Sequence, residues 1–190
     1  TFGHHAGDLI FYVGNHNQAT FFQEVMLNIS NDQSEAKMVL WADIDNDGDQ
    51  DFLVTNRNAS NKIWRNDGDM IFSDITESSG ISSQEDTKSY GASFGDYNND
   101  GFLDLYICNY HTYVDVSTNE LYQNNGDGTF TNVTVLAGVG NGLAQSFQST
   151  FIDIDLDGHL DLHVINDRVD YPNVFYKNNG DGSFTDRATD

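Results

Sequence analysis

The sequence predicts an all-β protein made of β-propeller-type blades of four antiparallel strands, with about three and a half blades in the chain. Three observations lead to this prediction. An aspartate-rich motif occurs three times, a hairpin motif follows each copy, and no helical period of 3.6 residues persists for three turns. Units of four short strands that repeat at roughly 50 to 60 residues are typical of a propeller.

The aspartate-rich motif has nine residues and carries Gly at its sixth position. Its copies begin at Asp43, Asp96 and Asp153, so their starts lie 53 and 57 residues apart. Positions 1, 3, 5, 7 and 9 of the three copies are Asp43, Asp45, Asp47, Asp49 and Asp51; Asp96, Asn98, Asp100, Phe102 and Asp104; and Asp153, Asp155, Asp157, His159 and Asp161.

The hairpin motif occupies residues 61–72, 119–130 and 173–184, and each copy contains an Asn-Gly or Asp-Gly pair. This pair predicts a tight turn in which both central residues have positive φ. Further strands are expected just before each acidic motif, at Lys37–Ala42, Tyr90–Phe94 and Ser146–Ile152, and just after it. We therefore divide one propeller-like domain, residues 1–190, into a partial blade at 1–35 and blades at 36–88, 89–145 and 146–190.

The composition limits the kinds of ligand and environment that the protein is expected to have. Thirty acidic residues against eight basic ones give a net charge of −22, which disfavours nucleic acid and favours cations. A content of 13% aromatic residues indicates a folded chain rather than an acidic tail. No apolar run approaches the roughly 20 residues of a membrane span, and the single cysteine, Cys108, is expected to be a buried thiol.

The acidic motifs predict about three Ca²⁺ sites, because Ca²⁺ prefers several oxygen ligands and Gly at position 6 allows a sharp bend. An EF-hand is excluded, since its twelfth position requires Glu and here holds Val54, Ile107 and Val164. The side chain of His159 is expected to face solvent, leaving only its carbonyl as a ligand. An Asx-rich turn that binds nothing is the alternative, but the motif places twelve of the thirty acids in three short loops, which repel themselves without a cation.

The paired motifs resemble the FG-GAP/VCBS repeat family, which forms the blades of integrin α-subunit propellers. Residues 95–106 and 119–134 are most similar to the cartilage acidic protein-like subgroup. The resemblance implies that the acidic loop joins the first two strands of a blade and binds calcium through positions 1, 3, 5, 7 and 9. Family propellers usually close with about seven blades. This chain is therefore expected to be part of a longer propeller, to be completed by other copies, or to stack in an open assembly.

Three sequons, at Asn28, Asn58 and Asn132, are compatible with secretion. Trp64, Tyr122 and Tyr176 occupy equivalent hairpin positions, where packing between blades is favoured over stacking on sugars. No catalytic signature is present. We expect an extracellular or cell-surface calcium-binding module, not an enzyme, that serves adhesion, assembly or ligand binding, with a protein or glycan ligand. A carbohydrate-binding lectin is the alternative, and a polysaccharide-acting enzyme is a third hypothesis.

Overall fold

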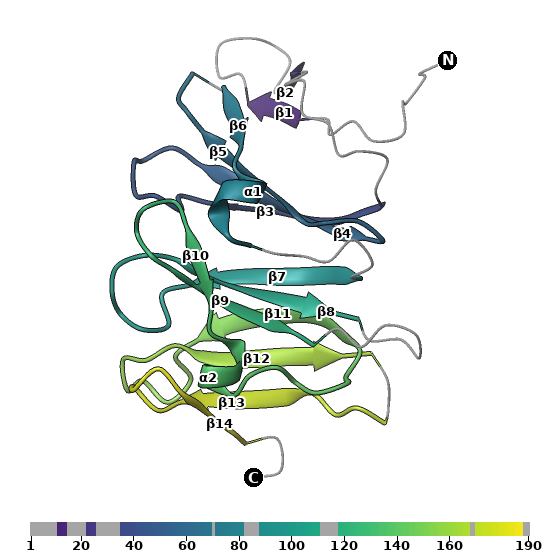
Figure 1. The fold of residues 1–190 in the computed structure, drawn as a ribbon, viewed down its shortest axis with the longest axis vertical. Coiled ribbons are helices and arrows are strands. Elements are labelled where there is room, and N and C mark those ends of the chain that lie inside the picture. Colours follow the sequence, from purple (N-terminus) through teal and green to yellow (C-terminus); the bar gives the residue numbers. More distant parts are fainter. Residues whose placement is uncertain are drawn as a thin grey trace.

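The computed structural model describes residues 11–14, 22–25, 35–69, 71–81, 88–110, 118–167 and 170–187. These residues form an all-β fold in which three four-stranded antiparallel sheets are stacked along the long axis of the molecule (Figure 1). The predicted fold of four-stranded blades is confirmed. Among the described residues, no helix combines the length and the apolar character needed to cross a membrane.

Each sheet follows the chain from its first strand to its fourth. Blade 1 contains β3 (Glu35–Ala42), β4 (Asp51–Arg57), β5 (Lys62–Asn66) and β6 (Phe72–Asp74). Blade 2 contains β7 (Ser89–Gly95), β8 (Asp104–Asn109), β9 (Glu120–Asn124) and β10 (Phe130–Asn132). Blade 3 contains β11 (Ser146–Ile152), β12 (Asp161–Asn166), β13 (Val174–Asn178) and β14 (Phe184–Asp186). A separate hairpin of β1 (Phe11–Gly14) and β2 (Phe22–Val25) lies in the segment where a partial blade was expected.

Strand alternation gives each blade two apolar faces, and neighbouring blades bury them against each other. Leu53 and Ile63 of blade 1 pack against Leu105, Ile107 and Tyr122 of blade 2 in one cluster. A second cluster joins the opposite face of blade 2 to blade 3; its members include Tyr106, Cys108, Leu121, Leu162, Val164 and Tyr176. Tyr122 and Tyr176 are thus buried between blades, as the packing interpretation predicted, and Cys108 is fully buried.

Polar side chains also join neighbouring blades, at the ends of the strands opposite the acidic loops. The amide of Asn61 donates to the hydroxyl of Ser89 (2.9 Å), which donates to Asn109 (2.7 Å). Asn119 and Ser146 repeat the first contact between blades 2 and 3 (2.8 Å). These side chains are buried, so the hydrogen bonds fix the register of one blade on the next.

The hairpin turn differs from the prediction. In blade 2 the loop between β9 and β10 spans residues 125–129, and only its two glycines, Gly126 and Gly128, have positive φ. A two-residue turn would need positive φ at both central residues. The longer loop is closed instead by the hydrogen bond from the N–H of Asn125 to the carbonyl of Thr129 (2.9 Å).

Two helices of a single turn were not predicted. They are α1 (Thr76–Ser79) and α2 (Thr134–Ala137), and each follows the fourth strand of its blade. The carboxylate of Asp74 accepts the N–H of Thr76 at 3.0 Å, and a glycine with positive φ, Gly80, ends the turn. The hydroxyl of Thr76 accepts the N–H of Ile63 in β5 (3.0 Å), so the turn is tied to the sheet.

Candidate metal centres

Each acidic motif forms the loop between the first and second strands of its blade, and the three loops have the same backbone. In loop 1 the carboxylate of Asp43 accepts the N–H groups of Asp47 (3.1 Å) and Gly48 (3.0 Å). Asp96 and Asp153 make the same pair of contacts in loops 2 and 3. Gly48 and its two equivalents have φ between 89° and 95°, which explains the requirement for glycine.

The carboxylate at position 9 is fully buried in every loop and joins the loop to the third strand. In loop 1, Asp51 accepts the N–H of Ile44 (2.9 Å) with one oxygen and the N–H of Asn66 (2.7 Å) with the other. Asp104 and Asp161 have the equivalent partners. Sequence reasoning treated this residue only as a ligand and missed its structural role, because its partners are backbone groups far away in the chain.

Several loop carboxyls are costly to ionise. Burial raises the pKa of Asp51 to about 6 and that of Asp104 to about 7, against the hydrogen bonds that favour their charged forms. Burial also raises the pKa of Asp45, with a contribution from the charge of Asp47. A positive ion beside these groups would offset the lost solvation.

The structure brings together part of the predicted ligand set in loops 1 and 3. Carboxylate oxygens of Asp43, Asp45 and Asp51 lie within 4.8 Å of one another, as do those of Asp153, Asp155 and Asp157. The acids of loop 2 form no such group within the described part of the chain. There, position 3 is Asn98, whose amide donates to Asp100 (2.8 Å).

Loop 1 offers a direct test of whether a metal fits. The Oδ1 atom of Asp45 is buried and has no hydrogen-bond partner in the part of the chain that the structure describes. A buried acceptor without a partner costs roughly 1–3 kcal/mol, and more when it is charged. The carboxylate of Asp45 is grouped with those of Asp43 and Asp51, and carboxylate oxygens are the atoms that bind hard cations such as Ca²⁺. The donor set of loop 1 therefore fits Ca²⁺.

The side chains at position 7 of loops 2 and 3 pack against the hairpin of their own blade. A Cβ added to Gly126 would lie 2.6 Å from the ring of Phe102, and one added to Gly180 would lie 2.8 Å from His159 Nε2. The Nδ1 atom of His159 also lies 3.2 Å from the amide of Asn99. The His159 side chain is half-buried, so it is held against the hairpin while part of it still faces solvent.

Successive loops are hydrogen-bonded to each other through position 4, which sequence reasoning did not single out. Asn46 donates to the carbonyl of Gly101 (3.0 Å), and Asn99 donates to that of Gly158 (3.0 Å). Both asparagines have φ of 60°, a conformation that Asn adopts more easily than most residues. In loop 3 this position is Leu156, also at φ 60° and 85% exposed.

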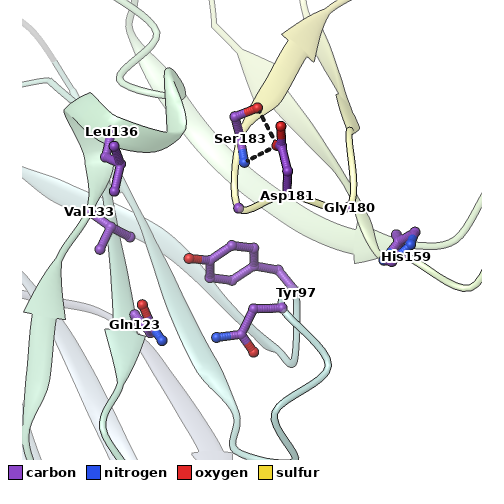
Figure 2. A pocket seen from close by; sticks show the side chains of 10 residues that line it. Tyr97, Gln123, Val133, Leu136, His159, Gly180, Asp181 and Ser183 are labelled. Atoms are coloured by element: carbon purple, nitrogen blue, oxygen red, sulfur yellow. Dashed lines mark hydrogen bonds between the residues drawn. The ribbon is translucent and has the colours of Figure 1, made fainter.

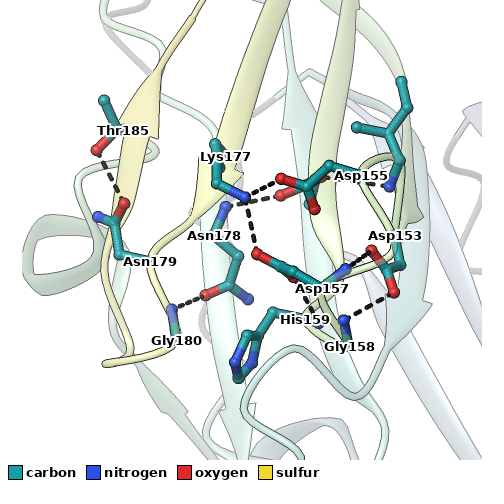
Figure 3. Close-up of polar contacts among 12 residues, drawn as sticks. Asp153, Asp155, Asp157, Gly158, His159, Lys177, Asn178, Asn179, Gly180 and Thr185 are labelled. Carbon is teal, nitrogen blue, oxygen red and sulfur yellow. Dashed lines mark hydrogen bonds and ion pairs between the residues drawn. The ribbon is translucent and has the colours of Figure 1, made fainter.

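Loop 3 differs from the others in holding a lysine. The ammonium of Lys177, in β13, contacts the carboxylate of Asp155 and lies 2.8 Å from that of Asp157 (Figure 3). These hydrogen bonds raise the pKa of Lys177, and the contact with Lys177 lowers the pKa of Asp157.

A cleft of about 430 Å³ opens between blades 2 and 3 beside these loops. Figure 2 shows the ring of Tyr97 pointing into it, with Gln123 and Val133 on one side and His159 and Ser183 on the other. Burial raises the pKa of Tyr97 to about 12, so its hydroxyl is neutral at ordinary pH. The lining is mixed, with amide, hydroxyl and apolar groups around one aromatic ring.

Stacked four-stranded sheets with an acidic loop at the same corner of each define a repeat protein of the β-propeller type. The model of the FG-GAP-like repeat matches residues 43–107 and 110–164, which together cover more than half of the chain. The protein therefore belongs to the FG-GAP repeat family. A comparison with curated proteins gives no match.

Proposed function

We propose that this protein is an extracellular calcium-binding propeller module and that each of its three acidic loops binds one Ca²⁺. The observation that carries the proposal is the buried Oδ1 of Asp45, which has no hydrogen-bond partner among the described residues and belongs to a carboxylate grouped with Asp43 and Asp51. The ligands proposed are positions 1, 3, 5 and 9 of each loop, with the backbone carbonyl at position 7. The bound ion would supply positive charge to desolvated carboxylates and so stabilise the blades.

Thermal unfolding in calcium against calcium-free buffer tests the metal. A ligand at 100 times its dissociation constant stabilises a folded protein by about 2.7 kcal/mol per site. Calcium should therefore raise the unfolding temperature, while Asp45→Asn should remove most of the gain that loop 1 contributes. An unfolding temperature that calcium does not change refutes the proposal.

We further propose that the outer face of blade 3 contacts another blade of the same repeat, in a second copy or in a longer chain. Position 2 of the acidic loop supports this. Ile44 is 2% exposed and Tyr97 4% exposed, because each packs against the next blade, whereas Ile154 is 60% exposed. Ile152 and Ile165 on the same blade are 45% and 43% exposed. The repeats act as protein-interaction modules, so adhesion or assembly is the role that fits.

Mass measurement in calcium buffer tests whether a second copy covers this face. We expect species larger than the 21.2 kDa monomer, and Ile154→Asp should reduce them. Val135→Asp is a matched control, since Val135 is 95% exposed on α2 rather than on the outer face of blade 3. A chain that stays monomeric at high concentration contradicts association between copies.

The lectin alternative rests on the polar lining of the cleft between blades 2 and 3, since Tyr97, Tyr122 and Tyr176 are all buried. Amide and hydroxyl groups around an aromatic ring suit a neutral sugar. A glycan array with and without calcium tests this: saturable, sugar-specific binding that Gln123→Ala weakens supports a lectin. We propose no enzymatic activity.

Location and subgroup are also proposals. The similarity of residues 95–106 and 119–134 to cartilage acidic protein-like repeats and the suitability of extracellular calcium levels for such loops favour secretion. The asparagine side chains of two sequons, Asn58 and Asn132, are exposed, while Asn28 lies outside the described residues. Mass spectrometry of the secreted protein before and after glycosidase treatment would reveal whether either asparagine is modified.

A further inference from the structure

The third strand of each blade places one side chain beside the acidic loop, and this residue differs in the three blades. Arg65, Gln123 and Lys177 occupy the same register, each paired with the second residue of the fourth strand. The guanidinium of Arg65 is directed to Asp67 in its own hairpin (2.7 Å). Gln123 carries no charge.

Lys177 alone among these three side chains forms an ion pair with loop carboxylates. Its ammonium contacts Asp155 and Asp157, which are positions 3 and 5 of loop 3 (Figure 3). The same two carboxylates, with Asp153, form the oxygen cluster of this loop. The lysine therefore contacts two of the three carboxylates that a metal ion would need.

We infer that Lys177 is a tethered counter-ion of loop 3, which offsets part of the loop's negative charge without metal and has to leave when a divalent cation binds. This inference rests on the proposed function. An ammonium offers one charge and three hydrogen-bond donors, whereas Ca²⁺ offers two charges and gathers six to eight oxygens. A divalent ion therefore competes with Lys177 for the carboxylates of Asp155 and Asp157.

Two consequences distinguish loop 3 from loops 1 and 2. Its calcium affinity is the lowest of the three, although it has four acids against the three of loop 2. It is also the loop that depends least on metal for its order. Charge alone would make loop 2 the weakest site, so the two arguments give different rankings.

The test is a calcium titration of the intact chain, with the backbone amide signals of Gly48, Gly101 and Gly158 in ¹H–¹⁵N NMR spectra as reporters. Each of these N–H groups donates to the position-1 carboxylate of its own loop at 3.0 Å, so the three probes are equivalent. The variant is Lys177→Met, which keeps the aliphatic stem and removes the charge. Arg65→Met is the matched control, and Lys177→Arg retains the cation.

In the wild type, Gly158 should respond at the highest calcium concentration. In Lys177→Met its midpoint should fall roughly tenfold or more, as expected when a unit charge a few ångströms from a divalent ion is removed. The midpoints of Gly48 and Gly101 should stay constant, and Lys177→Arg should keep the weak site. If Lys177→Met is unfolded without metal, the titration starts at saturating calcium and calcium is removed stepwise. Lys177→Gln is then measured in the same way.

An unchanged midpoint for Gly158 in Lys177→Met and Lys177→Gln overturns the inference. An equal fall of the Gly158 midpoint in Arg65→Met also overturns the inference, because the effect would then reflect the net charge of the protein rather than the contact of Lys177 with loop 3. If none of the three amides responds to calcium in any variant, the proposed calcium-binding function itself is wrong, which is a different result from a normal titration without a lysine effect.

Discussion

The contact between blades 1 and 2 should depend strongly on a single buried amide, that of Asn124. Its Nδ2 donates to the carbonyl of Ile44 in blade 1 (2.8 Å) and to that of Leu103 in its own blade (3.1 Å). Its Oδ1 accepts the N–H of Gly126 (2.9 Å), and the side chain is 1% exposed. Asn124→Ala removes all three hydrogen bonds and leaves buried partners unsatisfied.

The magnitude follows from these contacts and from a matched residue. Three hydrogen bonds at about 1 kcal/mol each, with an added penalty for the buried carbonyl of Ile44, give about 3–4 kcal/mol. Asn66 is the equivalent residue of blade 1, but it is less buried, and among the described residues its side chain bonds within its own blade, to Gln50 (3.3 Å) and Gly68 (3.1 Å). We expect about 1 kcal/mol for Asn66→Ala.

Urea unfolding in millimolar calcium, followed by tryptophan fluorescence and circular dichroism, measures both variants. Asn178→Ala is a second test, because Asn178 donates to Tyr97 of the preceding blade (2.8 Å) and to Leu160 (3.0 Å). It should behave like Asn124→Ala. The reasoning is refuted if Asn66→Ala costs as much as the other two, since the contact between blades would then contribute nothing beyond the hairpin itself.

Leu156→Asn should stabilise the protein by about 1 kcal/mol, because leucine at φ 60° is strained; an unchanged urea midpoint contradicts this. The thiol of Cys108, fully buried and with its pKa raised to about 12, should react with a thiol reagent only as fast as the protein unfolds, so rapid labelling of the native protein argues against the packing. Without calcium, stability should fall as pH rises from about 5 to 8, because the folded-state pKa values of Asp51 and Asp104, about 6 and about 7, exceed the roughly 3.9 of an unfolded chain. Calcium should weaken this trend, since it favours the ionised carboxylates. Thermal unfolding at four pH values measures both effects, and a metal-free unfolding temperature that does not change with pH contradicts the raised pKa values.

Much of the fold could be predicted because its signals are local. The strand Ser146–Ile152 was predicted with its observed bounds, and β3 and β7 begin only two residues and one residue earlier than expected. The bend at Gly48 was predicted too, since a residue at φ 95° is readily accommodated only by glycine. The single-turn helices were missed because four residues are too few to show a helical period.

The candidate site was only partly accessible from the sequence. The pattern of nine residues predicted the candidate ligand oxygens. It did not predict that both oxygens of Asp51 accept hydrogen bonds from backbone N–H groups. Nor could it predict that Lys177, twenty residues after Asp157 in the chain, would reach the loop. Both contacts form because β5 and β13 lie beside the acidic loops of their own blades in the folded sheet.

The sequence by itself determined the unit of this protein: four strands, an acidic loop and a hairpin, three times over, and with them the family. Tertiary structure alone decided what each copy does with the same motif position. Ile44 and Tyr97 are buried at blade contacts and Ile154 is exposed, although nothing in their local sequence separates them. The physical reason is that burial depends on whether another blade lies against that face, and a repeated sequence does not specify its own neighbours.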